Sequence, residues 1–323
     1  MEQTSRKLFI KGALTLGLGE LLSMSKTGAT PSLFKSSAAV PGPARVLRVA
    51  HLTDIHMMPD KTARNGFAEA LKQVNSLKDK PDFMINGGDS IMNAVTLTKS
   101  EVRKQWSSFK EIMKLENEIP VKSCIGNHDL FGWAIPGINK QDSKTWAADE
   151  MEMPSRYYSF IQNGWKFIVL DSIHSRKSIP GYFGKLDELQ FNWLHQELQS
   201  TPSGIHVCIV SHIPILAVCT FFDKSYINQN HWSVPDNTLH ADADRLRDLF
   251  YRNGNVKCCL SGHIHLIDHV NYLGSDYYCN GAVSGAWWKG DHKQFSPSFI
   301  IMNFFADGST TREVHHYNWK VSV

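Results

Sequence analysis

The stretch Leu47-Arg48-Val49-Ala50-His51-Leu52-Thr53-Asp54-Ile55-His56 places an apolar run directly before an acid and a histidine. Short apolar runs bounded by turn residues are typical of buried strands. Four more runs of this form occur along the chain, and each precedes a polar cluster: Phe83 to Asn86, Val121 to Ile125, Val207 to Val210, and Cys258 to Leu260. Because open α/β sheets carry their sites at the carboxyl ends of strands, we expect these clusters to meet.

The polar clusters are rich in groups that bind metal ions or phosphate. They are Asp54-Ile55-His56, Gly87-Gly88-Asp89, Gly126-Asn127-His128-Asp129, Ser211-His212 and Gly262-His263-Ile264-His265. Their donors are carboxylates, an amide oxygen and imidazoles, without a thiolate, and such donors favour Mn²⁺, Fe or Zn²⁺ over a soft metal. A single histidine of this set would be interpreted as structural. The clusters taken together predict a metal site, in which the glycines leave room for sharp turns toward the metal.

The donor set also suits one kind of chemistry. Phosphate esters resist hydrolysis because an anionic nucleophile must approach an anionic phosphorus. Two cations roughly 3.5–4 Å apart can generate a bound hydroxide and neutralise the phosphoryl oxygens. Two aspartates, one asparagine and four histidines would leave such a pair cationic. The sequence therefore predicts two divalent or transition metal ions and a small-molecule phosphate ester as substrate.

The order of the clusters resembles the calcineurin-like metallophosphoesterase family, whose pattern runs D-x-H, G-D, G-N-H-[DE], H, G-H-x-H. Every element is present between Asp54 and His265. The resemblance implies an α/β fold, a four-layer αββα sandwich of two mixed β-sheets flanked by helices. Within the family, GGDS, GNHD and GHIH resemble the bacterial cyclic-nucleotide phosphodiesterase branch.

Carried over position by position, the resemblance also implies residue roles. Asp54, His56 and His265 would hold the first metal ion. Asn127, His212 and His263 would hold the second, and Asp89 would bridge the two. His128 would face the scissile phosphate without binding metal and would protonate the leaving alkoxide or stabilise the transition state, with Asp129 orienting it. The residues expected to contact the substrate are Asn127, His128 and His212.

A hydrolase of phosphodiesters or phosphomonoesters, with a metal-bound hydroxide as nucleophile, is thus the leading interpretation. The alternative is a catalytically inactive metal-binding receptor or sensor on the same fold, against which the intact His128 argues. The chain has neither the G-x-S-x-G of serine hydrolases nor the G-x-x-x-x-G-K-[ST] of nucleotide-triphosphate binding. Met92 stands where purple acid phosphatases carry a metal-binding tyrosine, which disfavours a ferric site of that kind.

Apolar stripes at helical spacing predict helices between the strands, with the residues of each stripe in the core. Thr98 to Glu101 reads as a capping box that opens one of them. After His265 the pattern becomes strand-like, over 267–272, 277–280, 299–305 and 311–317. The stripes are Phe67, Leu71, Val74 and Leu77; Trp106, Phe109 and Met113; Leu189, Trp193, Leu194 and Leu198; and Leu246, Leu249 and Phe250.

The N-terminal part of the chain has a different character. Residues 1–43 are predicted to be an export signal and linker, and 44–323 the metallophosphoesterase domain. Ser5 to Lys11 resembles a twin-arginine signal with Lys7 in place of the second arginine, and the stretch after it is too short to span a bilayer. This predicts a periplasmic or secreted protein, with a cytoplasmic one as the alternative. Export disfavours cyclic AMP as substrate and favours a scavenging role.

Composition adds little to this. A net charge of +3 and a pI near 8.4 are too mild to indicate nucleic acid or an anionic membrane as a partner. The six cysteines form no C-x-x-C pair, so free buried thiols are expected, with room for one disulfide at most. Segments 130–156 and 213–239 are candidates for substrate recognition. In 281–290, Trp287 and Trp288 would either stack on a nucleobase or pack against the sheet.

Overall fold

The computed structural model describes residues 42–176, 181–228, 230–317 and 319–320. The predicted export signal, with all of the linker up to residue 41, lies outside the described residues. Among the helices of the described part, none combines the length and the apolar character needed to cross a membrane.

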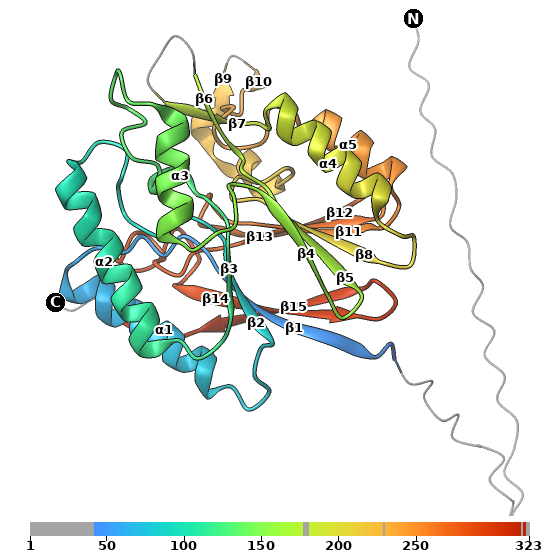
Figure 1. Ribbon diagram of the computed structural model, residues 1–323, viewed down its shortest axis with the longest axis horizontal. Helices are drawn as coiled ribbons and strands as arrows, with labels where there is room; N and C mark the ends of the chain where they lie inside the picture. The colour runs from blue at the N-terminus through green and yellow to red at the C-terminus, as the bar shows by residue number, and fades with distance from the viewer. Residues whose placement is uncertain (1–41, 177–180, 229, 318, 321–323) are drawn as a thin grey trace, which may run out of the picture. The chain divides into compact units, whose positions relative to one another are not determined.

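The first of two central sheets has the strand order β15-β14-β1-β2-β3 (Figure 1). Strands β1, β2 and β3 are parallel, whereas β14 runs antiparallel to β1 and β15 antiparallel to β14. This mixed sheet therefore joins the N-terminal strands to the last strands of the chain. Its strands are β1 (Arg45–Leu52), β2 (Phe83–Asn86), β3 (Val121–Ser123), β14 (Ser298–Phe305) and β15 (Thr310–His316).

The second sheet has the order β12-β13-β11-β8-β5-β4. Its four inner strands are parallel, and an antiparallel strand closes each edge. Both sheets are thus mixed, as expected. The strands are β4 (Tyr158–Gln162), β5 (Trp165–Val169), β8 (His206–Val210), β11 (Val256–Ser261), β12 (Ile267–Tyr272) and β13 (Ser275–Asn280).

Three apolar layers hold the sheets and helices together. Successive strand residues point to opposite faces, so Met84 packs toward α1 (Lys61–Ser76) and α2 (Lys99–Glu116), while Ile85 packs between the sheets. In the second sheet, Phe167 faces the first sheet and Ile168 faces α4 (Glu188–Ser200) and α5 (Ala243–Arg252). The predicted fold class, an α/β fold with mixed sheets flanked by helices, is confirmed.

The helices largely follow the predicted stripes, with one exception. Thr98 forms the predicted capping box with Glu101 at the start of α2. In α4, however, Leu189 is 77% exposed, so its assignment to the core was wrong. Gln190 takes the inward position, because its side chain exchanges hydrogen bonds of 2.8 and 2.9 Å with the backbone of Asp171. A fully bonded amide can be buried where a leucine was expected.

Both long segments proposed for substrate recognition contain secondary structure of their own. Segment 130–156 includes α3 (Lys140–Glu150). Segment 213–239 includes two short 3₁₀ helices and a hairpin, and a further small hairpin precedes α4. These pieces are Val218–Phe222, Lys224–Tyr226, β9 (Ile227–Asn228) with β10 (His231–Trp232), and β6 (Ile173–Ser175) with β7 (Tyr182–Gly184). All six cysteines are buried with free thiols, as expected.

Candidate metal centre

The predicted site residues follow the carboxyl ends of parallel strands. Most of them also have a left-handed backbone, which is uncommon outside glycine and clusters at functional sites. This conformation turns each side chain sharply after its strand. The residues and their φ angles are Asp54 (56°), His56 (48°), Asp89 (53°), His263 (70°) and His265 (60°).

Glycines at the site permit close approach. A Cβ on Gly126 would lie 2.1 Å from the backbone N of Asp89, and a Cβ on Gly262 would lie 2.3 Å from Oδ2 of Asp54. Neither distance is sterically allowed. Glycine is therefore needed beside the polar residues, as predicted, because one loop packs too closely against the next to leave room for a side chain.

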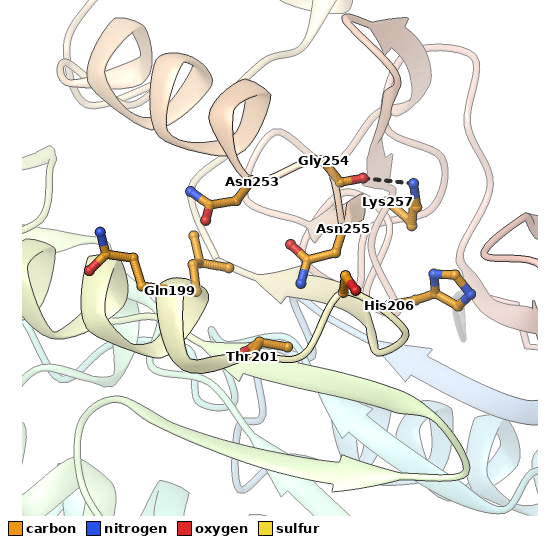
Figure 2. Close-up of a pocket in the computed structure, with 9 residues that line it drawn as sticks. Gln199, Thr201, His206, Asn253, Gly254, Asn255 and Lys257 are labelled. Carbon is orange, nitrogen blue, oxygen red and sulfur yellow. Dashed lines mark hydrogen bonds between the residues drawn. The ribbon is translucent and has the colours of Figure 1, made fainter.

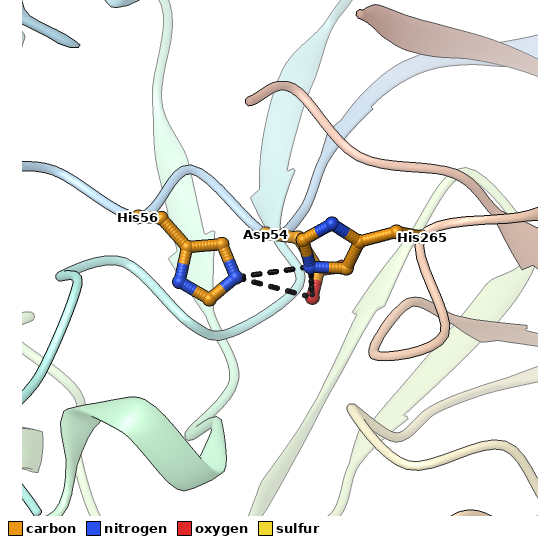
Figure 3. Close-up of side chains that lie close together, drawn as sticks. All are labelled: Asp54, His56 and His265. Atoms are coloured by element: carbon orange, nitrogen blue, oxygen red, sulfur yellow. Dashed lines mark hydrogen bonds and ion pairs between the residues drawn. The ribbon is translucent and has the colours of Figure 1, made fainter. Parts of the chain in front are cut away.

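The first group of converging donors contains Asp54, His56 and His265, all buried (Figure 3). Nε2 of His56 lies 3.0 Å from Nε2 of His265, which in turn lies 3.3 Å from Oδ1 of Asp54. Ligands bound at about 2.0–2.1 Å around a tetrahedral zinc ion would be roughly 3.3 Å apart. The separations therefore suit three ligands of one ion.

A second group contains Asp89, His212 and His263. Nε2 of His212 lies 3.2 Å from Oδ2 of Asp89, and the same oxygen lies 3.7 Å from Nε2 of His56. Neither Oδ1 of Asn127 nor Nε2 of His212, both buried, has a hydrogen-bond partner among the described residues. Buried polar atoms are normally satisfied, so these two atoms suit ligands of a cation.

Three of the four histidines donate their other ring N–H to a backbone carbonyl. Such a bond fixes the tautomer and directs the remaining nitrogen toward a metal, as is usual for metal-binding histidines. The bonds run from Nδ1 of His265 to Gly285 (2.6 Å), from Nδ1 of His212 to Gly87 (2.8 Å), and from Nε2 of His263 to Asn237 (2.8 Å).

The charges of the site are strongly coupled. Burial alone would lower the pKa of His212, but Asp89, Asp54 and the Gly87 carbonyl together outweigh it and raise the pKa to about 9. In the same way, burial would lower the pKa of His265, but Asp54, the Gly285 carbonyl and Asp89 together raise it. Burial, together with the positive charge of His212, lowers the pKa of His263 to about 4. Without metal, each group therefore holds one imidazole that favours the charged form.

His128 lies at the edge of both groups and is partly buried. Its backbone N–H donates to Oδ1 of Asp89 at 2.8 Å, and its Nδ1 bonds the backbone carbonyl of Met92. Its ring meets that of His56 edge-on, at 4.6 Å between centroids. His56, Asp89 and His128 also form a third set of converging donors. Nε2 of His128 is therefore left for a ligand at the centre.

Asp129 has contacts that differ from the expected ones. Its carboxylate was expected to orient His128, but it accepts backbone N–H bonds from Asp89, Ser90 and Gly126, at 2.8 to 3.0 Å, and a longer one from Ile91 at 3.2 Å. Because these donors saturate both oxygens, Asp129 holds together the turns after β2 and β3. The carbonyl of Met92, instead, orients the ring of His128.

His240 and Asp242 support the site and were not identified from the sequence. Nε2 of His240 lies 3.0 Å from Oγ of Ser211, and its Nδ1 lies 3.0 Å from Oδ1 of Asp242. All three are buried. Ser211 directly precedes His212. The contacts of Ser211 with His240, and of His240 with Asp242, therefore support the end of the strand that carries His212. The spacing His-x-Asp, directly after segment 213–239, marks this pair in the sequence but does not indicate its contact with Ser211.

A separate pocket lies at the other end of the second sheet (Figure 2). His206 at the start of β8 and Lys257 near the start of β11 line it, together with Gln199 and Asn253. The metal-binding candidates follow the carboxyl ends of the same two strands. This pocket is therefore distinct from the candidate centre.

The chain is similar in sequence to known proteins. The sequence model for calcineurin-like phosphoesterases matches residues 47–266. The chain is 22% identical, over 86% of its length and 95% of the relative's, to a 3′,5′-cyclic-nucleotide phosphodiesterase of Nostoc sp.. It is 26% identical to a serine/threonine-protein phosphatase of Rattus norvegicus, over 69% of this chain and 66% of that one.

A solved structure has a similar fold. The structure of a dimetal phosphatase from Danio rerio matches with a TM-score of 0.57 at 11% identity, over 84% of this chain and 100% of that chain. At this identity the likeness extends to the fold alone.

Proposed function

The chain belongs to the calcineurin-like phosphoesterase family, and from that premise we propose that it hydrolyses phosphate esters at a site for two metal ions. One observation carries the proposal. Oδ2 of Asp89 lies between a histidine of each donor group, 3.7 Å from Nε2 of His56 and 3.2 Å from Nε2 of His212. A carboxylate in this position suits a ligand shared by two ions.

The two groups then divide the remaining ligands. Asp54, His56 and His265 would hold the first ion. His212 and His263 would hold the second, together with the amide oxygen of Asn127, which has no hydrogen-bond partner within the described residues. The donors are oxygen and nitrogen atoms, which suit Mn, Fe or Zn. Bound there, the ions would supply a nucleophile at neutral pH and neutralise the phosphoryl oxygens.

The protein's own groups would bind the substrate and move its proton. His128 has its Nδ1 held by Met92, which leaves Nε2 free to donate a proton to the leaving alkoxide or to stabilise the phosphoryl charge. Asn127, its neighbour in the chain, and His212, which like His128 contacts Asp89, would contact the phosphoryl group as well. Asp129 would act indirectly, since it ties the Asp89 turn to the Gly126 turn.

The substrate is a phosphodiester or a phosphomonoester. The relatives carry names of both kinds, a cyclic-nucleotide phosphodiesterase and a protein phosphatase. The twin-arginine-like segment at Ser5 to Lys11 supports export, and an exported enzyme would act as a scavenging phosphatase or phosphodiesterase. Cytoplasmic location is the alternative, under which cyclic nucleotides would be available.

Metal-dependent hydrolysis of two model esters tests the proposal. Chelator-stripped protein should not cleave bis-p-nitrophenyl phosphate or p-nitrophenyl phosphate, and Mn²⁺ should restore cleavage of at least one. The ratio of the two rates reports the preference for diesters or monoesters. Protein that binds metal but cleaves neither ester would instead be the receptor or sensor considered from the sequence.

A further inference from the structure

Two adjacent tryptophans next to the metal centre lie in opposite environments. Trp288 is buried, with only 5% of its surface exposed, whereas Trp287 is 37% exposed. A Cβ on Gly66 would lie 2.2 Å from the ring of Trp288, so Trp288 packs tightly against α1. Of the two uses expected from the sequence, packing therefore describes Trp288 and leaves Trp287 to be explained.

The segment that carries the two rings is tied to the first donor group. Nε1 of Trp288 donates to the carbonyl of His56 at 3.0 Å. Oγ of Ser284 donates to the carbonyl of Asp54 at 2.8 Å, and the carbonyl of Gly285 accepts from Nδ1 of His265. Each candidate ligand of the first group thus has a hydrogen bond to the segment 284–288. These bonds fix the position of Trp287.

The backbone at both tryptophans is left-handed, with φ of 51° at Trp287 and 65° at Trp288. For bulky residues this conformation is a true outlier, and it persists only where the surroundings enforce it. Here it allows Trp288 to point into the core while Trp287 points outward.

The outward ring lies over the metal-binding side chains. Its centroid is 4.4 Å from that of His265, with the planes tilted by 33°, and 6.0 Å from that of His56. His292 meets the ring edge-on at 5.4 Å. A large, rigid and partly exposed aromatic surface therefore borders the place where the phosphate would bind.

We infer that Trp287 is a stacking platform for a planar aromatic group on the ester, either a nucleobase or an aryl ring. The inference rests on the proposed function, because it assumes that a phosphate ester binds at the adjacent centre. Stacking on an aromatic side chain contributes roughly 1–3 kcal/mol per base, which corresponds to roughly 5- to 150-fold in affinity. Trp287 would thus select esters with planar groups over aliphatic ones.

Phosphonates test this without turnover, since the enzyme would not cleave their carbon–phosphorus bond. Phenylphosphonate, an adenosine phosphonate and methylphosphonate would be titrated calorimetrically into metal-loaded protein. In Trp287→Leu, affinity for a planar ligand should fall roughly 5- to 150-fold, while that for methylphosphonate and the metal content stay unchanged. Trp287→Phe should keep part of the preference. If Trp287→Leu loses affinity for the adenosine phosphonate alone, the platform binds a nucleobase. If it loses affinity for both planar ligands, the platform binds aromatic rings in general.

Exposed Tyr251 on α5 provides the control, and Tyr251→Leu should change none of these affinities. If Trp287 only packs on His265, Trp287→Leu will weaken all three ligands alike or lower the metal content, and the inference is overturned. Unchanged binding of every ligand overturns it too. If wild-type protein holds metal but binds no phosphonate, the proposed function itself fails, and this outcome is distinct from the others.

Discussion

Oδ2 of Asp89 lies 3.2 Å from Nε2 of His212, although this nitrogen has no hydrogen-bond partner of good geometry in the described part of the chain. When the ring of His212 is neutral, both atoms have a lone pair to offer, and at this distance they suit two ligands of one cation. Since the same oxygen also faces His56, Asp89→Ala should weaken both ion sites at once. The metal content, measured by metal analysis, should fall from about two ions per chain in the wild type to nearly none in the variant.

A matched control is Asp149→Ala, which removes an exposed carboxylate from the last turn of α3. This variant should keep both ions. Retention of one tightly bound ion by Asp89→Ala would show that Asp89 belongs to a single site. Full activity of the wild type with one ion would refute the two-ion proposal altogether.

His128→Asn tests the role of the ring that Met92 orients. Both ions should remain bound, and turnover should fall roughly 10²–10⁴-fold, the usual contribution of a positioned acid or base. The loss should be larger for an ester with an alkyl alcohol than for p-nitrophenyl phosphate, because p-nitrophenolate leaves without a proton. Equal losses would assign His128 to charge stabilisation. A lower metal content of the variant would show that His128 is a metal ligand, which its position beside His56 and Asp89 allows.

Export can be tested on the sequence at Arg6 and Lys7. If these residues form a twin-arginine signal, changing both to Gln should leave unprocessed protein in the cytoplasm. Cell fractionation and the mass of the recovered chain are the measurements. Conservative change of Lys7 to Arg should preserve or improve export. If the double Gln variant is recovered from the periplasm in the same amount as the wild type, the protein is exported by a different route.

The strands and their polar ends could be predicted because both signals are local. An apolar run followed by a metal-binding cluster identifies β1, β2, β3, β8 and β11. Strand β5 (Trp165–Val169) was missed although it is equally apolar, because the residues that follow it, up to Asp171, do not form a metal-binding cluster. Asp171 instead forms ion pairs with Lys144 and Arg156.

The contacts behind the ligands could not be predicted in the same way. Asp129 was expected to bond its neighbour His128, yet it bonds amides some 40 positions earlier in the chain. His240 supports Ser211 across a separation of 29 residues. Such contacts depend on how the turns meet after folding, and no local spacing encodes them.

His240→Ala should weaken the second ion site selectively. The contact of His240 with Ser211 backs the strand end before His212, and loss of supporting contacts of this kind typically lowers metal affinity roughly 10–100-fold. The first site should be unaffected, so a two-step calorimetric titration with Zn²⁺ should change in one step only. Exposed His195 on α4 provides the control variant, His195→Ala. If both steps weaken together, His240 supports the fold as a whole.

Metal binding should release protons, with a dependence on pH that follows from His212. Its pKa is raised to about 9, so in metal-free protein near pH 7 its ring is protonated and paired with Asp89. A metal ligand must be neutral, so an ion entering the second group displaces this proton. Affinity should therefore increase with pH, by up to about tenfold per unit for one proton, and level off above about pH 9. His265, whose pKa is also raised, adds to the release. His263 adds none, because its lowered pKa of about 4 keeps it neutral.

Calorimetry at pH 7 in two buffers of different ionisation enthalpy measures the release of protons directly. The same titration at pH 10 should show little or none from His212, and equal release at both values would rule out this pairing of His212 with Asp89.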